Sequence, residues 1–180
     1  VDAVGRDHFI IGSVRSPFEY AATVRGLVGF MTDFYQDPDF VHELIAAVMP
    51  ATLAVGRALV QAGADAIVIK DSFASSSMLS PDHYRQFAWP SETDAIAQLK
   101  ESAPVILHIC RNSMPIVGLM AQTGADALEI DSPVDLAAVR DIVGDTIILK
   151  GNIDAAAVIE KGNGQEGEAG VRTARGGGKA

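Results

Sequence analysis

The segment Gln61-Ala62-Gly63-Ala64-Asp65-Ala66 has a counterpart further along the chain, Gln122-Thr123-Gly124-Ala125-Asp126-Ala127. In each copy a helical pattern ends at a glycine, and a short aliphatic run follows directly. A helix end, a glycine turn and a strand, repeated along a chain, are typical of the β-α units that build parallel sheets. The repeat therefore predicts an α/β fold.

Five short apolar runs are predicted strands: Phe9 to Val14, Ala66 to Lys70, Val105 to Cys110, Ala127 to Asp131 and Thr146 to Lys150. The last three begin about 20 residues apart, close to the minimum for a β-α unit, which favours a (β/α)8 TIM barrel. Such barrels usually need about 250 residues, whereas this chain has 180. We therefore expect residues 1–160 to form an incomplete barrel of about five parallel strands. An open doubly wound sheet is the alternative.

Helical patterns separate the predicted strands. The two longest run from Pro38 to Gln61 and from Pro81 to Lys100, and shorter ones cover Pro115 to Gln122, Val134 to Val143 and Ala155 to Glu160. Residues 161–180 contain seven glycines and lack apolar periodicity. We expect this tail to be poorly ordered.

Composition limits the classes of partner. A net charge of −9 without long Lys/Arg clusters argues against nucleic acid and against anionic membranes. The apolar stretch Leu44 to Val60 contains Pro50, Gly56 and Arg57, so we do not expect it to span a membrane. A signal-peptide pattern is not expected at the start either. The single cysteine excludes an internal disulfide and fits a reduced cytoplasm.

Polar side chains mark the carboxyl ends of four predicted strands, where α/β barrels bind their ligands. They are Lys70, Asp71 and Ser72; His108 and Cys110; Glu129 and Asp131; and Lys150 and Asn152. Burying an unpaired charge is costly, so charged residues at four successive strand ends indicate a site. For Asp71 and Asp131 a structural role stays open, in which each caps the helix that follows.

His108-Ile109-Cys110 puts an imidazole and the only thiol two residues apart on one strand, hence on one face. The pair can supply two of the four ligands of a tetrahedral zinc site, or a cysteine nucleophile and the histidine base that activates it. The alternative is that Cys110 is a small buried hydrophobe. Zinc needs at least one further protein ligand, and the candidates at equivalent strand ends are Glu129, Asp131 and Asp71.

Five motifs in this order resemble the uroporphyrinogen decarboxylase superfamily, over roughly residues 9 to 172: Ser16-Pro17-Phe18-Glu19-Tyr20-Ala21-Ala22-Thr23-Val24-Arg25-Gly26, Ala62-Gly63-Ala64-Asp65, Leu79-Ser80-Pro81, His108-Ile109-Cys110 and Leu149-Lys150-Gly151-Asn152-Ile153-Asp154. The His-x-Cys motif resembles its zinc-dependent branch, the methylcobamide:coenzyme M methyltransferases. That branch is a full (β/α)8 barrel, which implies that this chain is partial. Arg111 stands where the family commonly has glycine.

The resemblance implies a methyl transfer from a corrinoid carried by a partner protein to a small-molecule thiol such as coenzyme M. It implies zinc on His108 and Cys110, and on a second cysteine that this sequence does not contain; Glu129 is the candidate third ligand within the chain. We expect Asp71 and Asp131 to be catalytic, and Ser72, Lys150 and Asn152 to bind substrate.

Two alternatives stay open. The first is metal-free uroporphyrinogen decarboxylation, in which Asp71 or Asp131 binds pyrrole N–H groups and Ser72 binds a substrate carboxylate. Thr23 occupies the position of a tyrosine that binds substrate in that branch. The strand ends also carry few arginines, whereas a substrate with several carboxylates needs cationic contacts. This reaction is therefore ranked second. The second alternative is an inactive barrel fragment that lacks the third zinc ligand.

Overall fold

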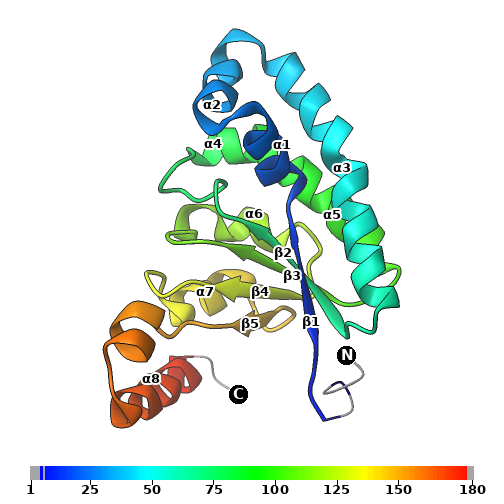
Figure 1. Cartoon of the computed structure of the whole chain (residues 1–180). Coiled ribbons are helices and arrows are strands. Elements are labelled where there is room, and N and C mark those ends of the chain that lie inside the picture. Colours follow the sequence, from blue (N-terminus) through cyan, green and yellow to red (C-terminus); the bar gives the residue numbers. More distant parts are fainter. Residues whose placement is uncertain (1–4, 6, 178–180) are drawn as a thin grey trace.

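A computed structural model describes residues 5 and 7–177. Five parallel strands lie side by side in chain order (Figure 1), namely β1 (Ile11–Arg15), β2 (Ala66–Asp71), β3 (Val105–Ile109), β4 (Ala127–Ile130) and β5 (Ile148–Lys150). A doubly wound sheet reverses its strand order at a switch point, whereas a barrel adds each strand beside the previous one. The prediction of an incomplete barrel with five parallel strands is confirmed.

The predicted helices all occur in the structure, together with three further ones, two before β2 and one within residues 161–180. The elements are α1 (Pro17–Arg25), α2 (Leu27–Gln36), α3 (Pro38–Gln61), α4 (Pro81–His83), the π-helical turn η1 (Tyr84–Ala88), α5 (Trp89–Lys100), the 3-10 turn η2 (Met114–Ile116), α6 (Val117–Ala121), α7 (Leu136–Val143), the π-helical turn η3 (Ala155–Glu160) and α8 (Gly164–Gly177). The sequence analysis did not predict α1 and α2.

The two faces of the sheet carry different side chains. One face packs beneath the helices and contributes Ile67, Ile69, Leu107, Ile109, Leu128 and Ile130 to the main hydrophobic core. The other face, called the inner face because a closed barrel turns it inward, carries a separate small cluster of Ile11, Ala66, Val68, Ile106 and Ala127. Alternate residues of a strand therefore point either to the helices or to the inner face. The position of a polar residue in this alternation decides which of the two faces it occupies.

Aromatic rings attach α1 and α2 to the rest of the fold. Phe18 and Phe30 are fully buried and meet edge to face, with ring centroids 5.1 Å apart. Phe34 contacts both rings and stacks on Phe87 of η1 at 4.4 Å. The cluster fixes α1 over the carboxyl end of the sheet, close to the predicted site.

Helix α3 is, by length and composition, the one candidate for a membrane span in the part of the chain that the structure describes. It contacts β1, α1 and α5 and buries Val41, Ile45 and Leu53. A Cβ at its Gly56 would lie 2.7 Å from the side chain of Leu99, so a larger residue there would require Leu99 of α5 to shift. The prediction that Leu44 to Val60 does not span a membrane stays a prediction.

In the structure α8 covers most of the tail (Figure 1), and the expectation that the tail is poorly ordered stays a prediction. The Asn163 side chain accepts hydrogen bonds from the N–H groups of Gln165 and Glu166, and the Glu166 carboxylate accepts one from the Asn163 N–H. This reciprocal cap offsets the low helix propensity of the glycines. Residues 178–180 lie outside the described residues, and the domain boundary at residue 160 stays a prediction.

Candidate functional site

A row of polar side chains crosses the carboxyl end of the inner face. The strand register aligns, from β1 to β5, the residues Arg15, Lys70, His108, Glu129 and Lys150. Aligned residues of neighbouring parallel strands point to the same face of a sheet. The structure therefore brings three of the predicted site residues, His108, Glu129 and Lys150, into one line.

The imidazole of His108 is oriented through one of its two nitrogens. Nδ1 lies 3.1 Å from the backbone carbonyl oxygen of Glu129 and 3.5 Å from its carboxylate Oε1, and the ammonium of Lys150 pairs with Oε2 of the same carboxylate. A carbonyl oxygen accepts only, so in the neutral imidazole Nδ1 carries the hydrogen and Nε2 keeps the lone pair. Glu129 thus leaves Nε2 as the nitrogen available to a ligand.

Cys110 lies at that nitrogen. Its Sγ is 3.3 Å from Nε2 of His108 and 3.6 Å from the hydroxyl of Ser72, and the thiol is half-buried. Tetrahedral zinc, with bonds of roughly 2.3 Å to sulfur and 2.0 Å to nitrogen, separates these two atoms by about 3.5 Å. The soft sulfur, the oriented imidazole and their spacing therefore fit two of the four positions around a zinc ion.

A third ligand is not beside this pair in residues 5 and 7–177, where no three His, Cys, Asp or Glu side chains are placed to hold one metal ion. The carboxylate of Glu129, the candidate third ligand, lies at Nδ1 of His108 rather than at Nε2. The two ring nitrogens point in different directions, so this position suits orientation of the imidazole.

Asp71 corrects the expectation that all the strand-end residues share one site. Lys70 aligns with His108, so Asp71, the next residue, lies on the opposite face and is fully buried beneath the helices. Its carboxylate accepts hydrogen bonds from the Ser16 hydroxyl and from the N–H groups of Phe73 and Ala74. The structure therefore does not bring Asp71 to His108. Nor does Asp71 cap the helix that follows, because Ser80 caps α4 while Asp71 fixes the turn after β2.

Burial raises the pKa of Asp71 to about 7; the hydrogen bond from Ser16 opposes the shift, and the charge of Glu19 adds to it. Glu92 of α5, fully buried, has its pKa raised well above the usual range by burial and then by the charge of Asp71. The hydroxyl of Tyr84 donates to Oε2 of Glu92 at 2.5 Å, while Oε1 has no hydrogen-bond partner among the described atoms. These shifts favour the protonated form of both carboxyl groups.

The sequence analysis did not single out Glu92. It is spaced along α5 with the buried residues Ala95, Ile96 and Leu99, three, four and seven positions later. That spacing is the apolar stripe of a helix, so the periodicity could have indicated a buried carboxyl group.

Asp131 and Asn152 organise the loops that follow β4 and β5. The Asp131 carboxylate accepts the N–H of Arg111 at 2.7 Å and that of Ser132 at 2.9 Å. Arg111 has φ +62°, a left-handed conformation that explains why glycine suits this position. The Asn152 amide donates to the carbonyl oxygens of Asp131 and Val134.

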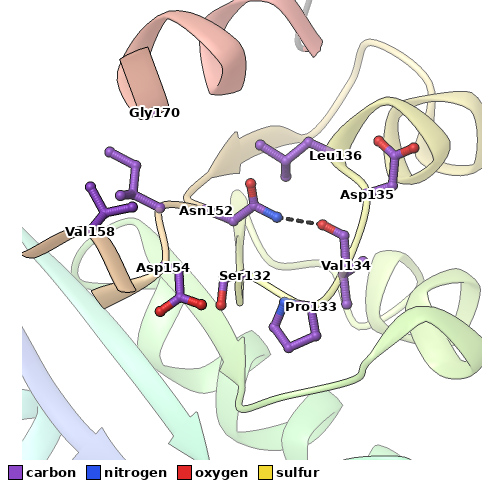
Figure 2. Close-up of a pocket in the computed structure, with 10 residues that line it drawn as sticks. Ser132, Pro133, Val134, Asp135, Leu136, Asn152, Asp154, Val158 and Gly170 are labelled. Atoms are coloured by element: carbon purple, nitrogen blue, oxygen red, sulfur yellow. Dashed lines mark hydrogen bonds between the residues drawn. The ribbon is translucent and has the colours of Figure 1, made fainter. Parts of the chain in front are cut away.

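A pocket of about 540 Å³ lies between these loops and α8 (Figure 2). It is lined by Ser132, Pro133, Val134, Asp135, Leu136, Asn152, Ile153, Asp154, Val158 and Gly170. Figure 2 shows the amide of Asn152 turned toward the Val134 carbonyl at its wall. Of the predicted site residues, Asn152 lines this pocket, whereas His108, Glu129 and Lys150 belong to the row on the inner face.

The sequence pattern of the uroporphyrinogen decarboxylase (URO-D) family matches residues 1–179. The chain belongs to the URO-D family. Its curated URO-D-family relatives include the methylcobamide:CoM methyltransferase MtbA of Methanosarcina mazei, 31% identical over 166 residues that cover 92% of this chain and 48% of the relative. Another is the uroporphyrinogen decarboxylase of Chlorobium phaeovibrioides, 37% identical over 122 residues that cover 67% of this chain and 34% of the relative.

A solved structure, a methyltransferase from Methanosarcina mazei, superposes with a TM-score of 0.93 at 27% identity, covering 98% of this chain and 52% of the other. The chain spans about half the length of the curated methyltransferase that it matches. The resemblance to the URO-D superfamily and to its methyltransferase branch is thus confirmed. Both kinds of relative are named as enzymes, so the family is one of enzymes.

Proposed function

We propose that the protein is a zinc-dependent methyltransferase, acting in the cytoplasm, that moves a methyl group from a corrinoid protein to a thiol such as coenzyme M. The observation that carries the proposal is the 3.3 Å approach of His108 Nε2 to Cys110 Sγ, with Nδ1 held by Glu129. The names of the relatives, which include methylcobamide:CoM methyltransferases, support the same reaction.

In this proposal His108 and Cys110 hold zinc, which when bound keeps a thiol deprotonated near neutral pH. The chain's own residues prepare the site. The Glu129 carbonyl and carboxylate fix the ring of His108, and Lys150 offsets the charge of that carboxylate. Lys70 is an exposed cation on the next strand, level with His108. The corrinoid protein would approach the carboxyl ends of the strands, where ligands of such barrels bind.

Cys110→Ser and His108→Ala are expected to lower the affinity for zinc by at least about 100-fold, since even outer partners of metal ligands typically cost 10 to 100-fold. Zinc affinity is measured by competition with a chelator, beside methyl transfer to coenzyme M. His42→Ala is the matched control, because His42 is an exposed residue of α3. Unchanged zinc binding and unchanged activity in Cys110→Ser would contradict the proposal.

Uroporphyrinogen decarboxylation is the second candidate, favoured by the 37% identity to the Chlorobium phaeovibrioides enzyme. The geometry favours it less, because Asp71 lies on the outer side of the sheet and Asp131 uses both carboxylate oxygens on backbone N–H groups. Turnover of uroporphyrinogen by chelator-treated protein would select this reaction. Absence of both activities and of zinc binding would select the third alternative, an inactive fragment.

A further inference from the structure

We propose that Glu19 of α1 is a positioning residue for Cys110 and acts through Ser72. Its carboxylate fixes the turn after β2 so that the Ser72 hydroxyl lies against the cysteine sulfur. This inference rests on the proposed function, in which Cys110 is a zinc ligand, and adds to it a residue from a helix that the sequence analysis did not predict.

The first link joins Glu19 to Ser72. Oε2 of Glu19 accepts the Ser72 N–H at 2.6 Å, and the side chain of Glu19 is 11% exposed. A hydrogen bond to a charged, buried acceptor is among the strong ones. The other oxygen lies 3.5 Å from Arg15, but that side chain is 55% exposed, and an exposed ion pair stabilises little. The bond to Ser72 is therefore the main fixed contact of this carboxylate.

Helix capping does not account for Glu19. Ser16 and Glu19 are spaced as a capping box, in which the glutamate reaches back to the N–H of the capping residue. Only half of the box forms, because the Ser16 hydroxyl accepts from the Glu19 N–H at 2.9 Å while the Ser16 N–H donates to the Lys70 carbonyl. The glutamate side chain is released from the cap and reaches across the end of β2 to Ser72.

The second link joins Ser72 to Cys110. The thiol donates to the Ser72 hydroxyl at 3.6 Å, on the same half-buried sulfur that approaches His108. A hydroxyl rotates freely, so the same oxygen donates to the sulfur when the sulfur is a metal ligand. Each of the two zinc-binding side chains then has its own outer partner, Glu129 for the imidazole and Ser72 for the sulfur. Such partners orient ligands and tune the affinity for the metal.

The test is a double-mutant cycle on zinc affinity. Ser72→Ala removes the hydroxyl, Glu19→Met keeps side-chain length without an acceptor, and Glu19→Gln keeps an acceptor for the Ser72 N–H. Ser72→Ala and Glu19→Met are each expected to lower zinc affinity about tenfold. The double variant is expected to be no weaker than Ser72→Ala, because one residue acts through the other. Glu19→Gln is expected to stay close to the parent protein.

A second readout is independent of metal. Cys110 is the only cysteine, so the alkylation rate of the metal-free chain by iodoacetamide reports on this thiol alone. Both Ser72→Ala and Glu19→Met are expected to speed alkylation about threefold by uncovering the sulfur, again without addition in the double variant. Glu43→Gln, at an exposed position of α3, is the control and is expected to change neither readout.

The two readouts separate this inference from the proposed function. If Cys110→Ser binds zinc as well as the parent protein does, the proposed function fails, while the alkylation cycle still decides the role of Glu19. Additive effects in the double variant would overturn the inference. So would Glu19→Met behaving as the parent protein does while Ser72→Ala shows its effect.

Discussion

Raising the pH from about 4 to about 8 is expected to lower the free energy of unfolding, because buried acids beneath the sheet must lose protons that the folded chain retains. Asp71 has its pKa raised from 3.8 to about 7 in the folded chain, mainly by burial. Between these two values the folded chain binds a proton that the unfolded chain does not, so stability decreases as the pH rises. About three pKa units at 1.36 kcal/mol each correspond to a loss on the order of 4 kcal/mol.

Glu92 changes stability in the same direction, since burial and the charge of Asp71 also raise its pKa. Below about pH 4 the contribution of Asp71 is fully present, and above about pH 7 it is fully lost. Urea unfolding at several pH values between 4 and 8.5 measures the slope. Asp71→Asn keeps the Oδ1 acceptor for the N–H groups of Phe73 and Ala74 and is expected to flatten the decline.

Asp126→Asn provides a control with the opposite sign. Burial raises the pKa of Asp126, but the hydrogen bond from the Val105 N–H and the contact with Lys100 outweigh burial and lower the pKa overall. Its contribution is therefore present at neutral pH and lost in acid. That change falls below about pH 4, so removing the carboxylate is expected to leave the slope of the decline between pH 4 and 8.5 nearly unchanged. An equal slope in the parent protein and in Asp71→Asn would contradict the prediction.

Gly151→Ala is expected to destabilise the chain by about 3 kcal/mol or more. Gly151 has φ +120°, and a Cβ there would overlap the backbone carbonyl oxygen of Ile130. Strained backbone costs about 1 to 3 kcal/mol and overpacking a similar amount. Backbone cannot rotate aside as a side chain does, so β5 must separate from β4. That movement pulls Lys150 away from Glu129, and we expect zinc affinity to fall as well.

Substitutions at two other glycines separate the cost of backbone strain from the cost of the steric overlap. Gly144 has φ +67° with nothing within 4 Å of an added Cβ, so Gly144→Ala measures backbone strain alone, about 1 to 2 kcal/mol. Gly167 of α8 has open space and no positive φ, so Gly167→Ala is expected to stabilise the chain by up to about 1 kcal/mol. Chemical denaturation of the three variants measures all of these effects. A loss in Gly151→Ala no larger than that in Gly144→Ala would contradict the overlap argument.

The strands were predictable because each is a short aliphatic run followed by a polar residue. All five lie within two residues of their expected bounds. Helix α1 was not predicted, because its buried residues include Glu19, which weakens the apolar pattern. Its placement depends on contacts between distant segments, such as the stacking of Phe34 on Phe87, which a local pattern does not contain.

The candidate site was predictable in part for a similar reason. The spacing of His108 and Cys110 indicated correctly that the two side chains meet, although β3 ends at Ile109 and Cys110 follows it directly. The prediction that Asp71 lies beside His108 was wrong. The face on which Asp71 lies depends on the strand register, and in that register Lys70 is the residue of β2 that aligns with His108. A shift of one residue moves a side chain to the other face. The bond from Ser72 to Glu19 crosses 53 positions of the sequence and leaves no local signal.

The chain-order sheet has a further consequence for handling the protein. Within the described residues, β1 and β5 each have a neighbouring strand on one side, so each presents a row of backbone N–H and C=O groups on its other side. Open rows of this kind recruit further strands, from a covalently attached segment or from another molecule. The tendency of the chain to associate with other molecules is therefore expected to depend on what pairs with β1 and β5, rather than on the polar row between them.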